Sequence, residues 1–131
     1  ASTIGGMVIN TAGVTLAHGM EHPASGLKNI VHGQGLAALT PEVIDASYKG
    51  DEEKFGNIAK IFGGKSAADC ADKIRDLKAI DLECKLSDLG IAEEDIPWMA
   101  ENCMKVSAAG VANNPVVFTQ EEIAEIYRKA L

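Results

Sequence analysis

Residues 18–33 read HGMEHPASGLKNIVHG, and this stretch contains all three histidines of the chain. His18 and His22 are four residues apart, so on a helix they would share one face with Cβ atoms about 5–6 Å apart. Pro23 disfavours helical geometry at His22 and, with the turn residues that follow it, predicts a helix end and a loop. A second helical pattern starts at His32. We therefore expect two helical segments joined by a loop, with the imidazoles forming a candidate reaction centre.

Length and composition restrict the class of protein. The 131 residues predict one domain spanning residues 1–131. Apolar residues make up 47% and charged residues 24%, a globular balance, and the net charge of −7 argues against nucleic acid as a partner. Cys70, Cys84 and Cys103 are an odd number without a Cys-x-x-Cys pair, which indicates neither a disulfide framework nor a zinc ribbon. We expect a cytoplasmic protein in a reducing environment.

The remaining pattern is typical of an all-α helical bundle. No stretch alternates convincingly like a β-strand, and residues 80–91 read as a loop with a short turn near Ser87. From His32 onward, Thr40 and Pro41 either kink the helix or restart it. Further helix starts are marked by capping signals at Asp51, at Ser66 with Asp69, at Asp95 to Pro97, and at Thr119 with Glu122.

Residues 1–20 carry no charged side chain, and a run of this length is long enough to cross a bilayer. Its glycines, threonines and Asn10, and the absence of a basic start, argue against a membrane segment or a signal peptide. We instead expect a helix that is apolar on every side, rich in small residues and buried among other helices. The chain lacks an initiator methionine, so we expect it to be part of a longer protein.

Two short motifs overlap the histidine stretch. His18, Glu21 and His22 fit the H-x-x-E-H pattern of zinc peptidases, in which the glutamate is the general base, although Pro23 would fray the helix at the second ligand. Residues 33–38, GQGLAA, formally match a dinucleotide fingerprint, but no strand precedes them, so we interpret these glycines as close helix packing. A third interpretation is that the histidines are hydrogen-bonded and functionally silent.

A longer pattern accounts for the whole chain. Residues 18–33 together with residues 88–97, DLGIAEEDIP, and residues 114–131, beginning NPVVFTQEE, resemble the C-terminal part of iron-containing (group III) alcohol dehydrogenases in the same order. The resemblance implies the helical, metal-binding C-terminal domain of the iron-containing alcohol dehydrogenase and dehydroquinate synthase-like fold. It also implies oxidation of alcohols or reduction of aldehydes, a small-molecule substrate, and homodimers.

The resemblance assigns roles to the three histidines. His18 and His32 would bind Fe²⁺ or Zn²⁺, and His22 would be a catalytic residue beside the substrate and nicotinamide, relaying a proton. This choice differs from the pairing of His18 with His22 that spacing alone suggests. NAD(P) would bind through an N-terminal nucleotide-binding domain that this sequence does not contain.

Three departures from the family pattern are visible. The family adds an aspartate and a further histidine from an earlier segment, Glu21 replaces a small residue, and Val31 stands where proline is common. We therefore expect a C-terminal fragment that is inactive by itself. The alternatives left open are a stand-alone all-α metal-binding or scaffold module without catalysis and, less favoured, an H-x-x-E-H zinc peptidase.

Overall fold

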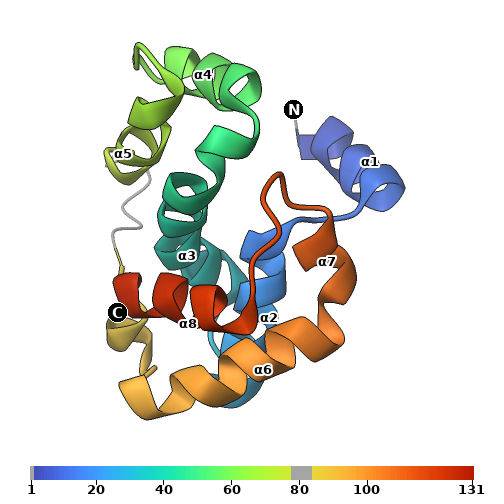
Figure 1. Ribbon diagram of the computed structural model, residues 1–131, viewed down its shortest axis with the longest axis vertical. Coiled ribbons are helices and arrows are strands. Elements are labelled where there is room, and N and C mark those ends of the chain that lie inside the picture. The colour runs from blue at the N-terminus through green and yellow to red at the C-terminus, as the bar shows by residue number, and fades with distance from the viewer. Residues whose placement is uncertain (1, 78–83) are drawn as a thin grey trace.

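The computed structural model describes residues 2–77 and 84–131, and the regular elements in these ranges are helices, with no strand (Figure 1). The all-α prediction is therefore confirmed. The short 3-10 turns are η1 (Tyr48–Gly50), η2 (Ala67–Asp69), η4 (Ser87–Leu89) and η5 (Glu93–Asp95). The α-helices are α1 (Ser2–Ala12), α2 (Leu16–Lys28), α3 (His32–Ser47), α4 (Glu52–Ile61), α5 (Cys70–Arg75), α6 (Ile96–Val106), α7 (Ala108–Ala112) and α8 (Gln120–Lys129).

One hydrophobic core joins α2, α3, α6 and α8, which lie together in the middle and lower part of Figure 1. Helix α2 packs against α3, α6 and α7, and α8 crosses both α3 and α6. Residues with fully buried side chains in this core include Leu16, Met20, Leu39, Ile96, Met99, Ile123 and Tyr127. The histidine-bearing helix is thus held by the best-packed part of the molecule.

Helix α2 does not end at Pro23, so the expected break there is wrong. The helix continues to Lys28 and ends at Asn29, whose φ of 54° is left-handed and whose N–H donates to the Ser25 carbonyl at 2.8 Å. Proline inside a helix costs about 3 kcal/mol because it lacks an N–H and its ring crowds the preceding turn. Pro23 is buried among the core helices, and packing outweighs this local preference. Helix α3 likewise runs without interruption through Pro41.

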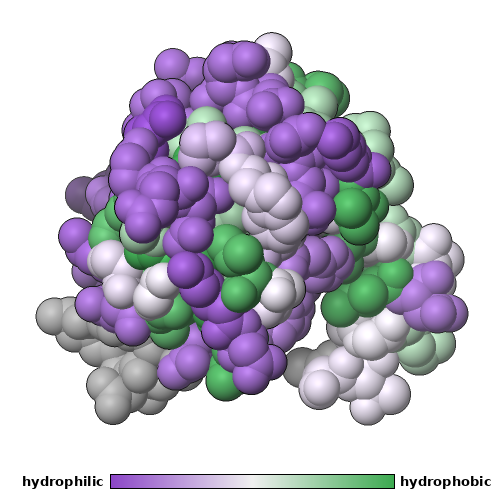
Figure 2. All heavy atoms as spheres, turned by 90° about the horizontal axis from the view of Figure 1, so that it is seen from below, coloured by the Kyte–Doolittle hydropathy of each residue, from purple (hydrophilic) through white to green (hydrophobic). Residues whose placement is uncertain are grey.

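Helix α1 forms, but the prediction that it is buried is wrong. None of its residues is buried, and Ile4 and Val8 are 67% and 56% exposed. Figure 2 shows mostly pale and green surface at the right of the view, where α1 lies. Gly13, with φ of 74°, separates α1 from α2, so the uncharged run divides into an exposed helix and the buried start of α2. No helix in the described ranges is long and apolar enough to cross a membrane.

The capping signals at Asp51, at Ser66 with Asp69, and at Thr119 with Glu122 are confirmed. Helix α6 begins at Ile96 as expected, but the Asp95 side chain makes no cap hydrogen bond to it. Asp51 accepts from the Lys54 N–H at 3.0 Å at the start of α4, and the Ser66 N–H donates to Asp69 at 2.9 Å. At α8 the Thr119 hydroxyl oxygen accepts from the Glu122 N–H while Glu122 accepts from the Thr119 N–H. The expected turn near Ser87 is η4. The part of the predicted loop up to residue 83 lies outside the described residues.

Candidate metal centre

The three histidines converge at the junction of α2 and α3. His18 and His22 lie on α2, and His32 is the first residue of α3 after a connection of three residues, 29–31. The ring centroids of His18 and His32 are 5.2 Å apart, those of His22 and His32 are 5.9 Å apart, and those of His18 and His22 are 6.5 Å apart. The left-handed turn at Asn29 reverses the chain and brings the two helices together. The expectation of two helical segments joined by a loop is confirmed, with the loop displaced to residues 29–31.

Glu21 lies on α2 between His18 and His22 in the sequence and is fully buried, whereas the His32 side chain is 51% exposed. One carboxylate oxygen of Glu21 contacts Nδ1 of His32, and the other accepts a hydrogen bond from the Ser25 hydroxyl. Ser25 Oγ also lies 2.9 Å from the carbonyl oxygen of Ile30 in the connection between the helices. The carboxylate thus links α2 to the first residue of α3.

The electrostatic environment favours a neutral imidazole at His18. Partial burial lowers the pKa of His18 below its usual range, the nearby His32 and His22 lower it further, and Glu21 acts in the opposite direction. Desolvation penalises the charged ring, and neighbouring imidazoles repel it when they are protonated. A neutral ring keeps the nitrogen lone pair that metal coordination requires.

The spacing of the rings allows a test of whether they fit a shared ion. A ring nitrogen about 2.1 Å from an ion places the ring centroid roughly 3.2 Å from it, so two rings at a tetrahedral angle have centroids about 5 Å apart. The His18 and His32 rings meet this value at 5.2 Å. At 6.5 Å, the His18 and His22 rings would have to lie on opposite sides of the ion. Within residues 2–77 and 84–131, no group of three or more His, Cys, Asp or Glu side chains is arranged to hold a metal.

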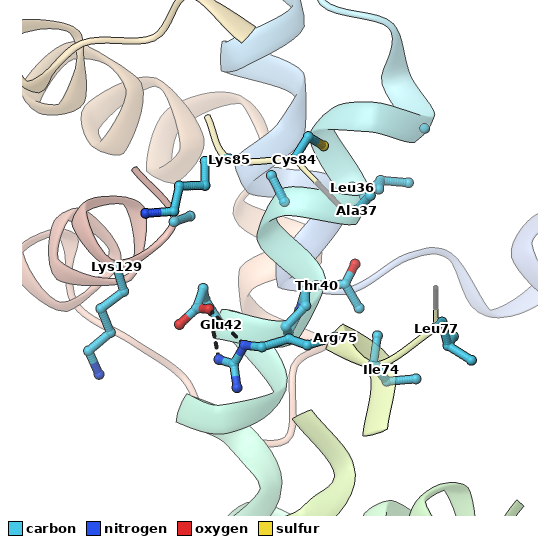
Figure 3. A pocket seen from close by; sticks show the side chains of 14 residues that line it. Leu36, Ala37, Thr40, Glu42, Ile74, Arg75, Leu77, Cys84, Lys85 and Lys129 are labelled. Atoms are coloured by element: carbon cyan, nitrogen blue, oxygen red, sulfur yellow. Dashed lines mark hydrogen bonds and ion pairs between the residues drawn. The ribbon is translucent and has the colours of Figure 1, made fainter. Parts of the chain in front are cut away.

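A separate hollow lies on another side of α3, and Figure 3 shows its lining. Leu36 and Thr40 of α3, Ile74 of α5 and Lys129 of α8 contribute to its walls, and none of the three histidines does. Arg75 donates to the Glu42 carboxylate at 2.7 Å across this hollow, joining α5 to α3. This ion pair is partly exposed, and no histidine lines the hollow, so we do not include the pair in the candidate metal centre.

Comparison with known proteins settles the family. The sequence model described as "Fe-containing alcohol dehydrogenase family, C-terminal" matches residues 1–131. The chain belongs to this family. Among curated relatives, a 1,3-propanediol dehydrogenase of Citrobacter freundii is 37% identical over 99% of the chain. A lactaldehyde reductase of Escherichia coli K12 is 29% identical over 97% of it. The chain spans about a third of the length of these relatives, 35% in both cases.

Solved structures show that the fold is shared as well. The structure described as 1,3-propanediol oxidoreductase superposes on this C-terminal family member with a TM-score of 0.83 at 35% identity. The match covers 96% of the chain and 35% of that structure. The resemblance found in the histidine stretch and the tail is therefore confirmed, and the fold is that of the C-terminal helical part of iron-containing alcohol dehydrogenases.

Sequence reasoning placed the three histidines together but missed two of their partners. It treated Glu21 as a possible general base or as an unexplained replacement, and it gave no role to Ser25. Ser25 is four residues after Glu21, a spacing that predicts contact on a helix. The contact between Glu21 and His32 crosses from one helix to another, so no local signal predicts it. Of the two glycines in the formal fingerprint, only Gly35 makes a close approach, to Glu21.

Proposed function

We propose that this chain is the metal-bearing helical part of an NAD(P)-dependent alcohol dehydrogenase that oxidises alcohols or reduces aldehydes. His18 and His32 supply two ligands for Fe²⁺ or Zn²⁺, and the remaining ligands and the nucleotide site belong to an N-terminal part. The family membership supports the reaction class. The named activities of the relatives, a propanediol dehydrogenase and a lactaldehyde reductase, indicate small alcohols and aldehydes as the substrate class.

The observation that carries this proposal is the 5.2 Å separation of the His18 and His32 ring centroids. Of the three imidazole pairs, this pair is nearest to the spacing expected for two ligands of one tetrahedral ion. Imidazole nitrogen suits both Fe²⁺ and Zn²⁺, so the donor atoms fit either ion. The two distances from His22, 5.9 Å to His32 and 6.5 Å to His18, both exceed this spacing, and the exposed His22 ring is open to solvent for another task.

The positions of the three histidines suggest a separate role for each in the proposed reaction. When bound, the ion supplies a Lewis acid for the alcohol oxygen and NAD(P) supplies the hydride acceptor. His18 and His32 hold the ion with neutral rings. His22, which is exposed beside them, accepts the hydroxyl proton released during oxidation and returns it to solvent.

Reconstitution tests the proposal. The chain is mixed with a separately produced N-terminal segment of a family member, and aldehyde-dependent loss of NAD(P)H absorbance is followed with added Fe²⁺ or Zn²⁺. We expect activity from the mixture and none from either part alone. Absence of activity despite formation of a stable complex would count against the dehydrogenase proposal.

Matched histidine variants separate the proposed roles. His18→Ala and His32→Ala are expected to remove most of the metal from the reconstituted complex. His22→Ala is expected to retain the metal while lowering the turnover at least tenfold, because a positioned general base contributes about 10²–10⁴-fold. Loss of metal in His22→Ala with full retention in His32→Ala would overturn the assignment of ligands.

The other candidate functions have less support from the geometry. A self-sufficient metal-binding module needs more ligands than two, and the described residues contain no group of three. Tight metal binding by the chain alone would favour that module. A zinc peptidase needs Glu21 to reach a water on the ion, but Glu21 is fully buried with both oxygens occupied.

The structure also bears on how this chain would fit into a complete dehydrogenase. A single core cluster joins α2, α3, α6 and α8, and we propose that residues 1–131 form one domain. The exposed apolar side chains of α1 would be covered by the N-terminal part of a complete dehydrogenase, because apolar surface of this kind marks contact sites.

A further inference from the structure

The Glu21 carboxylate is fully buried, and its burial requires an explanation. A fully buried carboxylate is costly unless each oxygen is hydrogen-bonded, and no lysine or arginine forms an ion pair with Glu21 among the described residues. Its partners are the Ser25 hydroxyl and Nδ1 of His32. Both come from the junction that carries the proposed metal ligands, so the burial of this charge is tied to that junction.

Space for Glu21 is provided by the facing helix. A Cβ atom on Gly35 would lie 2.8 Å from Cγ of Glu21 and 3.0 Å from its Oε1. Real Cβ atoms do not approach other atoms this closely, so any side chain at position 35 would displace the carboxylate. Gly35 and Glu21 therefore form a complementary pair, in which the absence of one side chain accommodates the other.

The contact with the carboxylate determines which nitrogen of His32 carries a proton. When the carboxylate oxygen accepts the hydrogen bond in this contact, Nδ1 of His32 is the donor. Nε2 of the neutral ring then keeps its lone pair. Free imidazole side chains in water favour the opposite tautomer, with hydrogen on Nε2, which cannot bind a metal through that atom.

We propose that Glu21, oriented by Ser25, is a positioning residue that fixes His32 in the Nδ1–H tautomer with Nε2 available to a divalent cation. This inference rests on the proposed function in one respect, namely that His32 is a ligand. Carboxylate partners of ligating histidines orient the ring and raise its basicity, and their loss typically lowers metal affinity 10–100-fold. The negative charge of the carboxylate would also attract a cation bound at the neighbouring rings.

The first experiment needs no metal and no activity. Long-range ¹H–¹⁵N NMR spectra of the ¹⁵N-histidine-labelled chain distinguish the two tautomers of each imidazole. We expect the Nδ1–H form at His32 in the native chain and in Glu21→Gln, whose amide oxygen still accepts. In Glu21→Ala we expect a shift towards the Nε2–H form. The Nε2–H form in the native chain, or an unchanged tautomer in Glu21→Ala, would overturn the proposal.

The second experiment combines the same proteins with the N-terminal segment and measures the affinity of each complex for Zn²⁺ and Co²⁺ by competition with a chelator. We expect a 10–100-fold weaker Kd for Glu21→Ala and a smaller loss for Glu21→Gln. Ser47→Ala is the matched control, because Ser47 is also fully buried and hydrogen-bonded, to Asn114, but lies far along α3 from His32. Equal losses in Ser47→Ala and Glu21→Ala would show a structural effect only and overturn the proposal.

The remaining outcomes are also decisive. If Glu21→Ala does not fold, as judged by circular dichroism, Glu21→Met replaces it, because methionine fills a similar volume without an oxygen that accepts from Nδ1. An unchanged tautomer in that variant overturns the proposal. A native chain that holds the Nδ1–H tautomer but binds neither ion in the complex with the N-terminal part contradicts the ligand assignment in the proposed function. In that case the tautomer fixed by Glu21 still stands.

Discussion

At the scale of single residues, the contact between Glu21 and Gly35 shows how one position constrains another across two helices. The Glu21 carboxylate occupies the volume that a side chain at position 35 would need. The same carboxylate contacts Nδ1 of His32, so the packing of Gly35 affects a proposed metal ligand that it does not touch. Substitution of either residue is therefore informative about both.

Gly35→Ala is predicted to destabilise the fold by about 1–3 kcal/mol, because overpacking outweighs the better helix propensity of alanine. The double variant Glu21→Ala with Gly35→Ala is predicted to be more stable than the sum of the two single effects indicates, because the clash is then removed. Urea unfolding followed by circular dichroism measures these free energies. Gly33→Ala is the control, since a Cβ there meets no atom within 4 Å. Additive effects of the two substitutions would contradict the proposed clash.

The free energy of unfolding is predicted to fall above about pH 9, because the buried Cys103 thiol and the buried Tyr127 hydroxyl resist losing their protons in the folded chain. Burial raises the pKa of the Cys103 thiol to about 12, and it also raises the pKa of Tyr127, with Cys103 and Glu21 contributing to that rise. The unfolded chain therefore loses these protons at lower pH than the folded chain, so rising pH favours unfolding, by up to about 1.4 kcal/mol per pH unit for each group.

Urea unfolding between pH 7 and 10.5 measures this effect. Cys103→Ala is expected to reduce the slope between pH 9 and 10, where the tyrosines of the unfolded chain, with a pKa of about 10, are still largely protonated. The slopes are compared, not the absolute free energies, because the substitution also leaves a cavity. Parallel curves for the two proteins would refute a contribution from Cys103.

At the scale of elements, α8 depends on its first turn. The Thr119 hydroxyl oxygen accepts from the Glu122 N–H at 3.3 Å, and Glu122 accepts from the Thr119 N–H at 2.8 Å. The helix then buries Ile123, Ile126 and Tyr127, and the Tyr127 hydroxyl donates to the Met20 carbonyl on α2. The cap thus supports the packing of the histidine-bearing helix.

Thr119→Ala is predicted to lower the free energy of unfolding by about 1 kcal/mol, the usual cost of losing an N-cap side chain. Gln120→Ala is the matched control, because residue 120 is exposed and follows the cap, and its effect is expected to stay within about 0.5 kcal/mol. Thermal unfolding followed by far-ultraviolet circular dichroism compares the two variants. Equal effects would show that the cap contributes little.

At the scale of the whole molecule, α1 and α2 have opposite relations to the core despite the uncharged sequence that they share. Asn113 Nδ2 donates to the carbonyl oxygens of Ala12 and Val14, at 3.2 Å each, and so ties the end of α1 to the segment after α7. No residue of α1 is buried, whereas Leu16 at the start of α2 is 0% exposed.

Paired truncations test this difference. Leu16→Ala is predicted to cost about 2–5 kcal/mol because it leaves a cavity in the core, and Val8→Ala on α1 is predicted to change the free energy of unfolding by less than about 0.5 kcal/mol. Chemical unfolding of both variants gives the comparison. A large loss in Val8→Ala would show that α1 is buried in solution against something outside this fold.

The sequence by itself determined the helices, most of their ends and the family. Capping residues such as Asp51 and Thr119 act within one helical turn, so the helix starts that they mark can be predicted from neighbouring residues. Pro23 is the exception: the local rule predicts a helix end, but burial of α2 among α3, α6 and α7 overrides it.

Only the tertiary structure decided which side chains meet across the helices. Sequence spacing pairs His18 with His22, yet the shortest separation between ring centroids is that of His18 and His32, on different helices. The sequence pattern likewise predicted neither the contact of Glu21 with His32 nor the exposure of α1. The physical reason is that periodicity fixes which residues share the face of one helix, whereas the neighbours of that face depend on how the helices cross.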